Sequence, residues 1–151
     1  MMREPKFVPK AGQVDYTFIR YCPTVNCVVV YQGKILMVKR SSGMRLYPNL
    51  WNGIAGFLDD ELSVIQKAKE ELLEELNIGA AQIESIRRGR VLTTESKVYK
   101  KTWIIFPVLV TVKTDTFKLD YEAQAAKWIE PKKALSLNLV PGFDKILAEF
   151  F

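Results

Sequence analysis

Short apolar runs separated by polar turns dominate the first third of the chain. Thr24–Tyr31 and Lys34–Arg40 are apolar and rich in β-branched residues, and the Gln-Gly pair between them is typical of a tight turn, so together they predict a β-hairpin. Ser41–Leu50 contains glycine, proline and asparagine and indicates a loop. Trp51–Phe57 predicts another strand, and its glycines indicate a close approach to the backbone.

The hydrophobic period then changes from two residues to 3.6, which predicts one long helix. Ser63 followed by Gln66 fits a capping box at its start, and Asn77 and Gly79 can adopt the left-handed turn that ends a helix. The apolar residues that recur at helical spacing are Val64, Ile65, Ala68, Leu72 and Leu76.

The rest of the chain returns to strand-like patterns and closes with short helical ones. Pro107 interrupts one of these strands, which favours an edge position or a bulge there. Strands on both sides of one long helix, with helices at the end, predict a mixed β-sheet sandwiched by helices (α/β/α), in a single domain spanning residues 1–151. The predicted strands are Ile83–Leu92, Tyr99–Lys113 and Ala126–Ile129, and the predicted helices are Pro131–Leu135 and Phe143–Phe150.

Composition narrows the chemistry that such a domain can perform. The chain has no histidine, which excludes Ser-His-Asp and Cys-His nucleophiles, histidine-rich zinc sites and histidine bases. The two cysteines, Cys22 and Cys27, cannot complete a zinc site and are expected to be reduced strand or core residues. Acid–base and metal chemistry would therefore depend on carboxylates, lysines, tyrosines or bound water.

The net charge of the chain bears on which ligands it binds, and the lengths of its apolar runs bear on where it is located. A net charge of +5 and a pI near 9.2 favour anionic ligands such as nucleotides, but the basic residues are scattered, which argues against a nucleic-acid-binding module. No run is long enough for a membrane span or a secretion signal, so we expect a cytoplasmic protein.

Three glutamates share one flank of the predicted helix. At about 100° per residue, Glu71, Glu74 and Glu75 lie beside the apolar stripe, where the helix meets the sheet. Like charges at this spacing repel one another, and a bound dication would reverse that effect. Clustered carboxylate oxygens suit Mg²⁺ or Mn²⁺, although a glutamate-rich helix face is also a common solvated surface.

The segment from Gly56 to Ile78 resembles the Nudix box, which is written G-x5-E-x7-R-E-U-x-E-E-x-G-U with U an aliphatic residue. The residues that match are Gly56, Glu71, Leu72, Glu74, Glu75 and Ile78. Three positions depart from the pattern: Leu62 replaces a glutamate, Glu70 replaces an arginine that orients a box carboxylate, and Asn77 replaces a glycine. Asp59, Asp60 or Glu61 could serve in place of the first glutamate, and Arg40 or another base in place of the arginine.

The resemblance implies a metal-dependent hydrolase that cleaves the diphosphate linkage of a nucleoside diphosphate derivative. Glu71 and Glu75 would hold Mg²⁺ or Mn²⁺, supported by Glu74 and the Gly56 carbonyl. The catalytic residues would include Glu71, and the general base would be Glu74 or Glu122. A solvated loop charge is the more frequent role for a residue placed like Glu122.

Outside the box, basic and aromatic side chains are candidates for holding the substrate. Arg40 and Arg45 are candidates for the phosphates, and Tyr47 and Trp51 for stacking on a base, although tryptophans are more often packing residues. The substrate would be a small molecule, with a capped RNA 5′ end as the one nucleic acid in range, and the terminal Phe150-Phe151 pair suggests a docked tail or a homodimer contact.

Two alternatives remain at this point. The departures at Leu62 and Glu70 would also suit a catalytically weak or inactive protein that uses the same fold to bind a nucleotide as a regulator. An isomerase of isoprenoid diphosphates shares the fold, but the related enzymes need a histidine-containing metal site, which this chain lacks.

Overall fold

Two parallel strands form the centre of the sheet. In the computed structural model, which describes residues 3–151, β1 (Tyr21–Tyr31) pairs with β7 (Lys101–Val112), from Tyr21 opposite Thr102 to Val30 opposite Thr111. Side chains alternate along a strand, and both faces of β1 are covered, so its sequence is almost continuously apolar.

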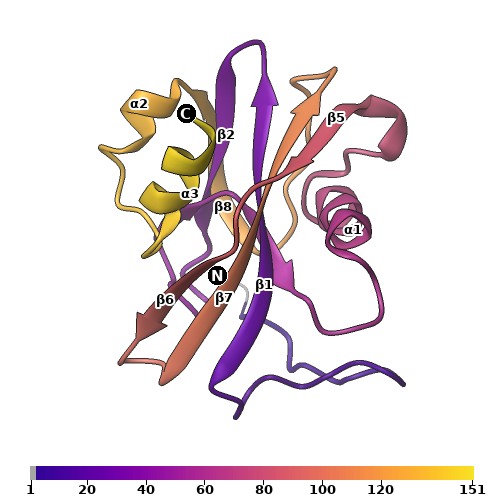
Figure 1. The fold of residues 1–151 in the computed structure, drawn as a ribbon, viewed down its shortest axis with the longest axis vertical. Helices are drawn as coiled ribbons and strands as arrows, with labels where there is room; N and C mark the ends of the chain where they lie inside the picture. Colours follow the sequence, from indigo (N-terminus) through magenta and orange to yellow (C-terminus); the bar gives the residue numbers. More distant parts are fainter. Residues whose placement is uncertain (1–2) are drawn as a thin grey trace.

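The other strands extend this central pair to form one mixed sheet (Figure 1). β2 pairs antiparallel with β1, β3 and β8, while β4 pairs with β1, and β5 and β6 follow one another along the outer side of β7. Their bounds are β2 (Lys34–Arg40), β3 (Trp51–Asn52), β4 (Ile54–Phe57), β5 (Ile83–Arg88), β6 (Leu92–Ser96) and β8 (Ala123–Ile129).

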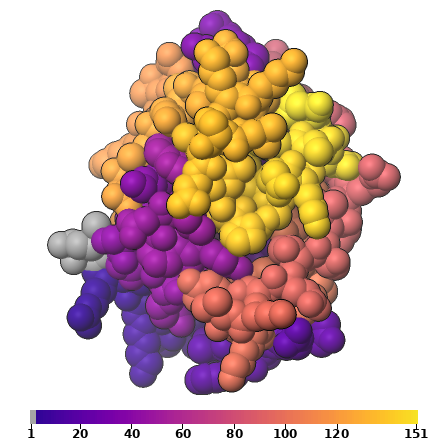
Figure 2. All heavy atoms as spheres, turned by 90° about the vertical axis from the view of Figure 1, so that its left-hand side faces the viewer, coloured from indigo at the N-terminus to yellow at the C-terminus, as the bar shows by residue number. Residues whose placement is uncertain are grey.

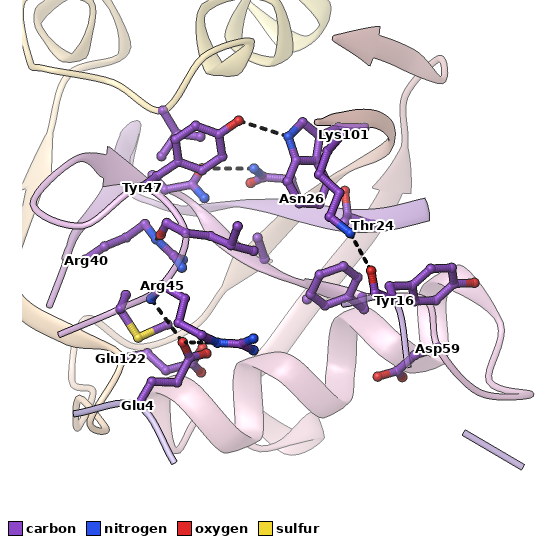
Figure 3. A pocket seen from close by; sticks show the side chains of 18 of the residues that line it. Glu4, Tyr16, Thr24, Asn26, Arg40, Arg45, Tyr47, Asp59, Lys101 and Glu122 are labelled. Atoms are coloured by element: carbon purple, nitrogen blue, oxygen red, sulfur yellow. Dashed lines mark hydrogen bonds and ion pairs between the residues drawn. The ribbon is translucent and has the colours of Figure 1, made fainter. Parts of the chain in front are cut away.

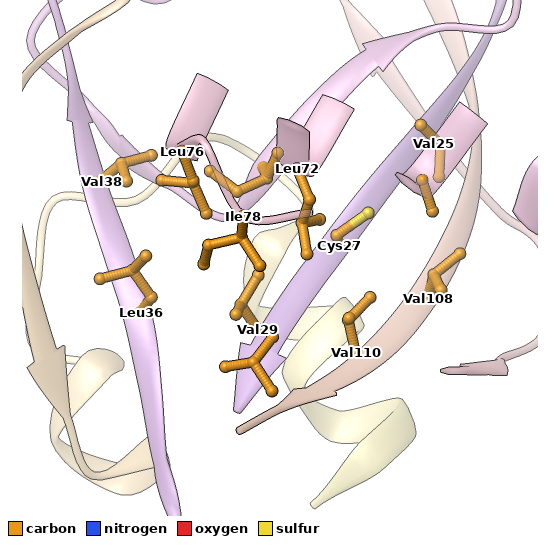
Figure 4. Packing of buried hydrophobic residues seen from close by; sticks show 13 residues of the cluster. Val25, Cys27, Val29, Leu36, Val38, Leu72, Leu76, Ile78, Val108 and Val110 are labelled. Carbon is orange, nitrogen blue, oxygen red and sulfur yellow. The ribbon is translucent and has the colours of Figure 1, made fainter. Parts of the chain in front are cut away.

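Helices cover both faces of the sheet, as predicted. α1 (Val64–Leu76) lies on one face, and α2 (Pro131–Ala134) and α3 (Phe143–Phe150) lie on the other; a single 3-10 turn, η1 (Ala80–Gln82), follows α1 (Figure 1). Each face has its own apolar core. Leu72 and Leu76 of α1 pack on β1, β2 and β7 (Figure 4), while Phe143 and Ile146 of α3 pack on the opposite side.

The predicted hairpin and the long helix are confirmed in detail. The turn between β1 and β2 has positive φ at Gln32 and Gly33. Ser63 accepts a hydrogen bond from the Gln66 backbone and completes the capping box, and Asn77 ends α1 in the left-handed conformation with φ 56°. An asparagine thus replaces the glycine of the family pattern without changing the turn.

Two of the predicted strands are each divided into two, and Pro107 does not lie at a sheet edge. The Trp51–Phe57 strand is two strands that break at Gly53, because β3 pairs with β2 whereas β4 pairs with β1. The Ile83–Leu92 strand also splits, since β5 ends at Arg88 and a second strand begins at Leu92. For Pro107 the expected edge position is not found, because β7 is paired on both sides, but the other expectation, an irregular position, has support. The ladder is interrupted between β5 and β6 opposite Pro107, whose carbonyl accepts a hydrogen bond from Gly89 N in this break.

The cysteines, the apolar segments and the terminal phenylalanines can be compared with what the sequence predicted. Both cysteines are buried and free, as predicted. Within residues 3–151, no helix is long and apolar enough to cross a bilayer. Of the terminal pair, Phe150 lies under the Arg87 guanidinium at 5.3 Å, while Phe151 remains 58% exposed.

Candidate active site

The three glutamates of α1 occupy graded depths beside the sheet. Glu75 is only 9% exposed, Glu71 is half-buried and Glu74 is exposed. This gradient follows from their angular positions, since Glu75 lies closest to the buried stripe of Leu72 and Leu76. The expected placement of the cluster at the border of the core is therefore found in the structure.

Burial and mutual repulsion raise the pKa values of the deepest carboxyl groups. Burial, with the charges of Glu74 and Glu70 acting in the same direction, raises the pKa of Glu71 to about 7. Burial together with Glu122 and Glu71 raises the pKa of Glu75 well above its usual range. Glu75 Oε2 is buried and has no hydrogen-bond partner among residues 3–151. A buried, unpartnered carboxylate oxygen is costly, and a cation would satisfy it.

Glu122 joins this cluster from the opposite side of the cleft. It lies just before β8, half-buried, and burial with Asp120 and Glu71 raises its pKa to about 8. The positive charge of Arg40 acts in the opposite direction. Glu122 is therefore part of the carboxylate cluster, and a freely solvated loop charge is the wrong description of it.

A buried lysine lies one turn before Glu70, the position of the arginine in the family pattern. Lys67 is 3% exposed, and its Nζ lies 2.7 Å from Asp60, 3.3 Å from Asp59 and 3.7 Å from Glu70. Burial lowers the pKa of Lys67, but its bond to Asp60 and the neighbouring carboxylates outweigh this and raise it. These three partners do not include Glu71, Glu74 or Glu75, so Lys67 forms a different ion-pair network from the one that the resemblance implies for an arginine at position 70. The Nε of Arg40 donates to the Leu46 carbonyl, and within residues 3–151 Arg40 forms no ion pair with a box carboxylate.

The carboxylates line a cleft that adjoins a larger cavity. The cleft contains Glu70, Glu71, Glu74 and Glu122, and the neighbouring cavity has a volume of about 390 Å³. Much of the cavity wall is aromatic or aliphatic, including Tyr16, Tyr47, Phe57, Trp103, Ile105 and Phe143. Both spaces share the residues Ala55, Gly56, Phe57, Asp59 and Glu122, so an elongated molecule can occupy the two together.

The structure brings most of the predicted substrate residues to this cavity. Arg40, Arg45 and Tyr47 line it, and Figure 3 shows both arginines on the same side as Glu122. Tyr47 is held in place by Tyr99, whose hydroxyl accepts a hydrogen bond from the Tyr47 backbone, and by Trp103, whose Nε1 donates to the Tyr47 hydroxyl.

Trp51 is not among the residues that line either space. It packs in the core beneath α3, and Lys127 Nζ lies 4.9 Å from its ring centre. Its position between β2 and the chain near Leu139 explains this, because Trp51 exchanges backbone hydrogen bonds with Asn138 and Val140.

Several lining residues could not be identified from the sequence. Residues 4–17, before the first strand, contribute to both spaces, and Lys101 of β7 reaches the cavity from beneath them. This N-terminal stretch has no periodic pattern, and the only signal was a set of isolated apolar residues, Phe7, Val8, Val14 and Tyr16. Their role depends on contacts with residues far away in the chain.

The carboxylate cluster fits a hard cation that takes its remaining ligands from water and from the phosphates of a substrate. Among residues 3–151, no three acidic or cysteine side chains converge on one point as a complete metal cage. Mg²⁺ seldom needs such a cage, because it binds one or two carboxylates together with water and substrate phosphates. Glu71 lines the cleft, whereas Glu75 is not among the lining residues and its unpartnered Oε2 is buried. Together they supply a set of carboxylates as small as such an ion needs.

Comparison with known proteins gives a consistent family assignment. The model of the NUDIX domain matches residues 20–150. The phosphatase NudJ of Escherichia coli (strain K12) is 26% identical over 115 residues, which cover 76% of this chain and 72% of NudJ.

Solved structures share the fold at lower sequence identity. An Ap4A hydrolase from C. elegans, in a binary complex, is 23% identical with a TM-score of 0.68 and covers 87% of this chain and 95% of its own. The NUDIX domain of Shewanella oneidensis NrtR, complexed with ADP ribose, is 18% identical with a TM-score of 0.70 and covers 92% of each chain. At these identities the likeness shows the fold alone.

Proposed function

This chain belongs to the Nudix family of hydrolases, and we propose that it cleaves the diphosphate linkage of a nucleoside diphosphate derivative with the help of Mg²⁺ or Mn²⁺. The observation that carries the proposal is the continuity between the carboxylate cleft and the larger cavity. The polyphosphate end of such a molecule would lie in the carboxylate cleft with the cation, and its bulky organic end would lie in the larger, largely apolar cavity.

The carboxylates of α1 would hold the cation, as the family resemblance implies. Glu71 and Glu75 provide the principal oxygens, while Glu74 and the Gly56 carbonyl complete or support the shell. When bound, the dication neutralises charge at phosphorus and acidifies a water molecule for in-line attack. The protein contributes a half-buried cleft in which these charges are poorly screened.

Glu122 is the general base that the geometry favours over Glu74. Glu122 lies on the wall shared by both spaces, where the bond to be cleaved would lie, and Glu74 lies on the exposed side of the helix. A base must reach the attacking water directly or through one other water. Glu122 would accept its proton from the cavity side while Glu71 and Glu75 hold the cation.

The organic part of the substrate would occupy the cavity beside the cleft. Tyr47 and Trp103 provide aromatic surface for a base, and Arg40 and Arg45 lie between this surface and the carboxylates, where they can contact phosphate or ribose oxygens. ADP ribose, which is bound in the NrtR structure, is one molecule of this shape.

A nucleotide-binding protein with little or no activity is the second candidate. The departures at Leu62 and Glu70 favour it, as does the absence of a complete three-ligand cage among residues 3–151. Such a protein would bind the same molecules in the same site without releasing product.

Turnover of a nucleotide panel separates these two candidates. The purified chain would be incubated with Mg²⁺ or Mn²⁺ and ADP ribose, other nucleotide sugars, dinucleoside polyphosphates, oxidised nucleoside triphosphates and capped RNA, with products followed by chromatography. We expect turnover that falls at least about 100-fold in Glu75→Gln, while the exposed control Glu84→Gln retains full activity. Tight nucleotide binding without turnover of any compound would contradict the hydrolase proposal and support the binding protein.

A further inference from the structure

The chain before β1 forms a wall of the active site, although it precedes the part that matches the family. We call residues 4–19 the N-terminal arm; the NUDIX domain match begins at residue 20. The arm contributes Glu4, Phe7, Val8, Val14 and Tyr16 to the larger cavity, and Lys10 and Gln13 to the carboxylate cleft. In Figure 2 its first residues lie beside the 41–50 loop, where Glu4 pairs with Arg45.

One end of the arm is fixed by a buried lysine. Lys101 is 6% exposed, and its Nζ donates hydrogen bonds to the backbone carbonyls of Tyr16, Thr17 at 3.1 Å and Ile19 at 2.6 Å. The Tyr16 ring also stacks on Phe57 with 5.7 Å between ring centres. A buried ammonium must have its donors satisfied, so these contacts hold the arm against the sheet.

The middle of the arm is fixed by Asp59, which lines the cleft. Val14 N donates to the Asp59 carbonyl at 2.7 Å, and Gln13 Nε2 donates to Asp59 Oδ2 at 2.9 Å. A tight turn precedes these contacts, with Gln13 N bonded to the Lys10 carbonyl and Gly12 at φ 81°. The turn therefore fixes the backbone of Lys10 beside the cleft, and Lys10 is one of the residues that line it.

Lys10 is the cation at this cleft that remains available to a ligand. Lys67, the other lysine on the cleft wall, is 3% exposed and is bound by Asp59, Asp60 and Glu70. Lys10 is exposed, and within residues 3–151 it forms no ion pair. Its charge still acts on the cluster, since it opposes the rise in the pKa of Glu74 caused by burial and Glu70.

We propose that Lys10 binds the phosphates of the substrate, with its ammonium on a non-bridging oxygen of the diphosphate. The inference rests on the proposed function, because it assumes that the phosphates enter the carboxylate cleft. A diphosphate adds negative charge to a wall already rich in glutamates, and Glu70 replaces the arginine of the family pattern. A lysine on a fixed turn supplies the missing positive charge.

The test compares Lys10→Gln with Lys10→Arg and with the control Lys69→Gln. Lys69 is also exposed, but it lies on α1 outside both spaces. Two quantities would be measured: KM and kcat for the best substrate of the panel, and the Kd of α,β-methylene-ADP with Mg²⁺ by calorimetry. We expect Lys10→Gln to raise KM and Kd about tenfold with kcat changed less than about threefold, as loss of an exposed charge contact at the phosphates predicts.

Two further readouts distinguish a phosphate contact from a structural role. The arginine variant should recover most of the affinity, and the difference between Lys10→Gln and the natural protein should shrink at high salt. Lys69→Gln should match the natural protein throughout, and the melting temperature of every variant should stay unchanged.

The Lys10 inference and the proposed hydrolase function can fail separately, and the experiment distinguishes the two failures. An unchanged KM and Kd in Lys10→Gln would refute the role of Lys10. An unchanged KM with tighter Mn²⁺ binding in the absence of nucleotide would also refute it, because Lys10 would then only balance the charge of the carboxylates. If the natural protein binds α,β-methylene-ADP but hydrolyses nothing, and Lys10→Gln weakens that binding, the hydrolase proposal fails and the Lys10 contact stands. Absence of both binding and turnover refutes both.

Discussion

The carboxylate of Glu71 lies directly against the Cα atom of Gly56. A Cβ atom added to Gly56 would collide with Glu71 Oε1 and Cδ, and it would come within 3.0 Å of Glu71 Cγ. Gly56 lies in β4 opposite Val25, so the absence of its side chain lets the helix bring a carboxylate onto the sheet. The glycine of the motif is thus required by the position of the Glu71 side chain.

Gly56→Ala should therefore displace Glu71 and remove most of the activity. We expect kcat/KM to fall at least about 30-fold and the free energy of unfolding to fall by about 1–3 kcal/mol, as is usual for overpacking. Gly79→Ala is the matched control, because no atom lies within 4 Å of a Cβ at that position. Steady-state kinetics and urea unfolding would test both variants; full activity in Gly56→Ala would contradict the proposed role of Glu71.

The stability of the metal-free protein should decrease as pH rises. The pKa is raised from 4.5 to about 7 for Glu71 and to about 8 for Glu122, so the folded state binds more protons than the unfolded state between these values. This contribution is complete below about pH 4.5 and is lost as pH rises through 7 and 8. We expect the melting temperature to fall by roughly 5 °C from about pH 6 to about pH 9.

Added Mg²⁺ or Mn²⁺ should restore the melting temperature at high pH, because the dication neutralises the carboxylates that have lost their protons. Thermal melts across this pH range, with and without metal, would test both statements. Glu75→Gln should flatten the profile, since one of the interacting carboxyl groups is removed. A metal-free melting temperature that rises with pH would contradict the account of the cluster.

Lys67 should contribute more to stability than any exposed lysine of the chain. Lys67→Met leaves Asp59 and Asp60 without their shared cation, and Asp59 is buried beside the cleft. We expect a loss of about 2–4 kcal/mol in the free energy of unfolding, since breaking a buried pair leaves an uncompensated charge. Lys69→Met, on the exposed side of the same helix, should change it by less than about 0.5 kcal/mol. Equal effects would contradict a special role for Lys67.

Lys101→Met should detach the N-terminal arm without unfolding the sheet. The substitution removes the donor shared by three arm carbonyls, including those of Thr17 and Ile19. Trypsin should then cleave at Lys6 and Lys10 at least about tenfold faster than in the natural protein, because cleavage follows local opening. Lys113→Met, an exposed site just after β7, serves as the control. Equal cleavage rates would show that Lys101 does not hold the arm.

The helix and its glutamates could be predicted because their signals are local. The capping box at Ser63, the apolar stripe ending at Leu76 and the left-handed Asn77 depend on residues within a few positions of one another. The angular order of Glu71, Glu74 and Glu75 then follows from helix geometry alone. The spacing of these residues also matches the family motif, so both the fold class and the carboxylate cluster followed from the sequence.

The strand breaks and the rest of the site depended on pairing between distant segments. Whether Gly53 ends a strand is determined by which partner each side of it finds, and Pro107 is tolerated inside the sheet because β5 and β6 leave a break opposite it. Trp51 and Tyr47 are both aromatic and only four positions apart, yet only Tyr47 reaches the cavity.

The sequence by itself determined the elements, the mixed sheet and the identity of the acidic residues, because these features arise from short-range periodicity and chemistry. Only the tertiary structure decided that Lys67 pairs with Asp59 and Asp60, that Glu122 joins the cluster, and that the N-terminal arm lines the cavity. Those contacts join residues with no shared pattern, and their free energy is gained only once packing has brought them together.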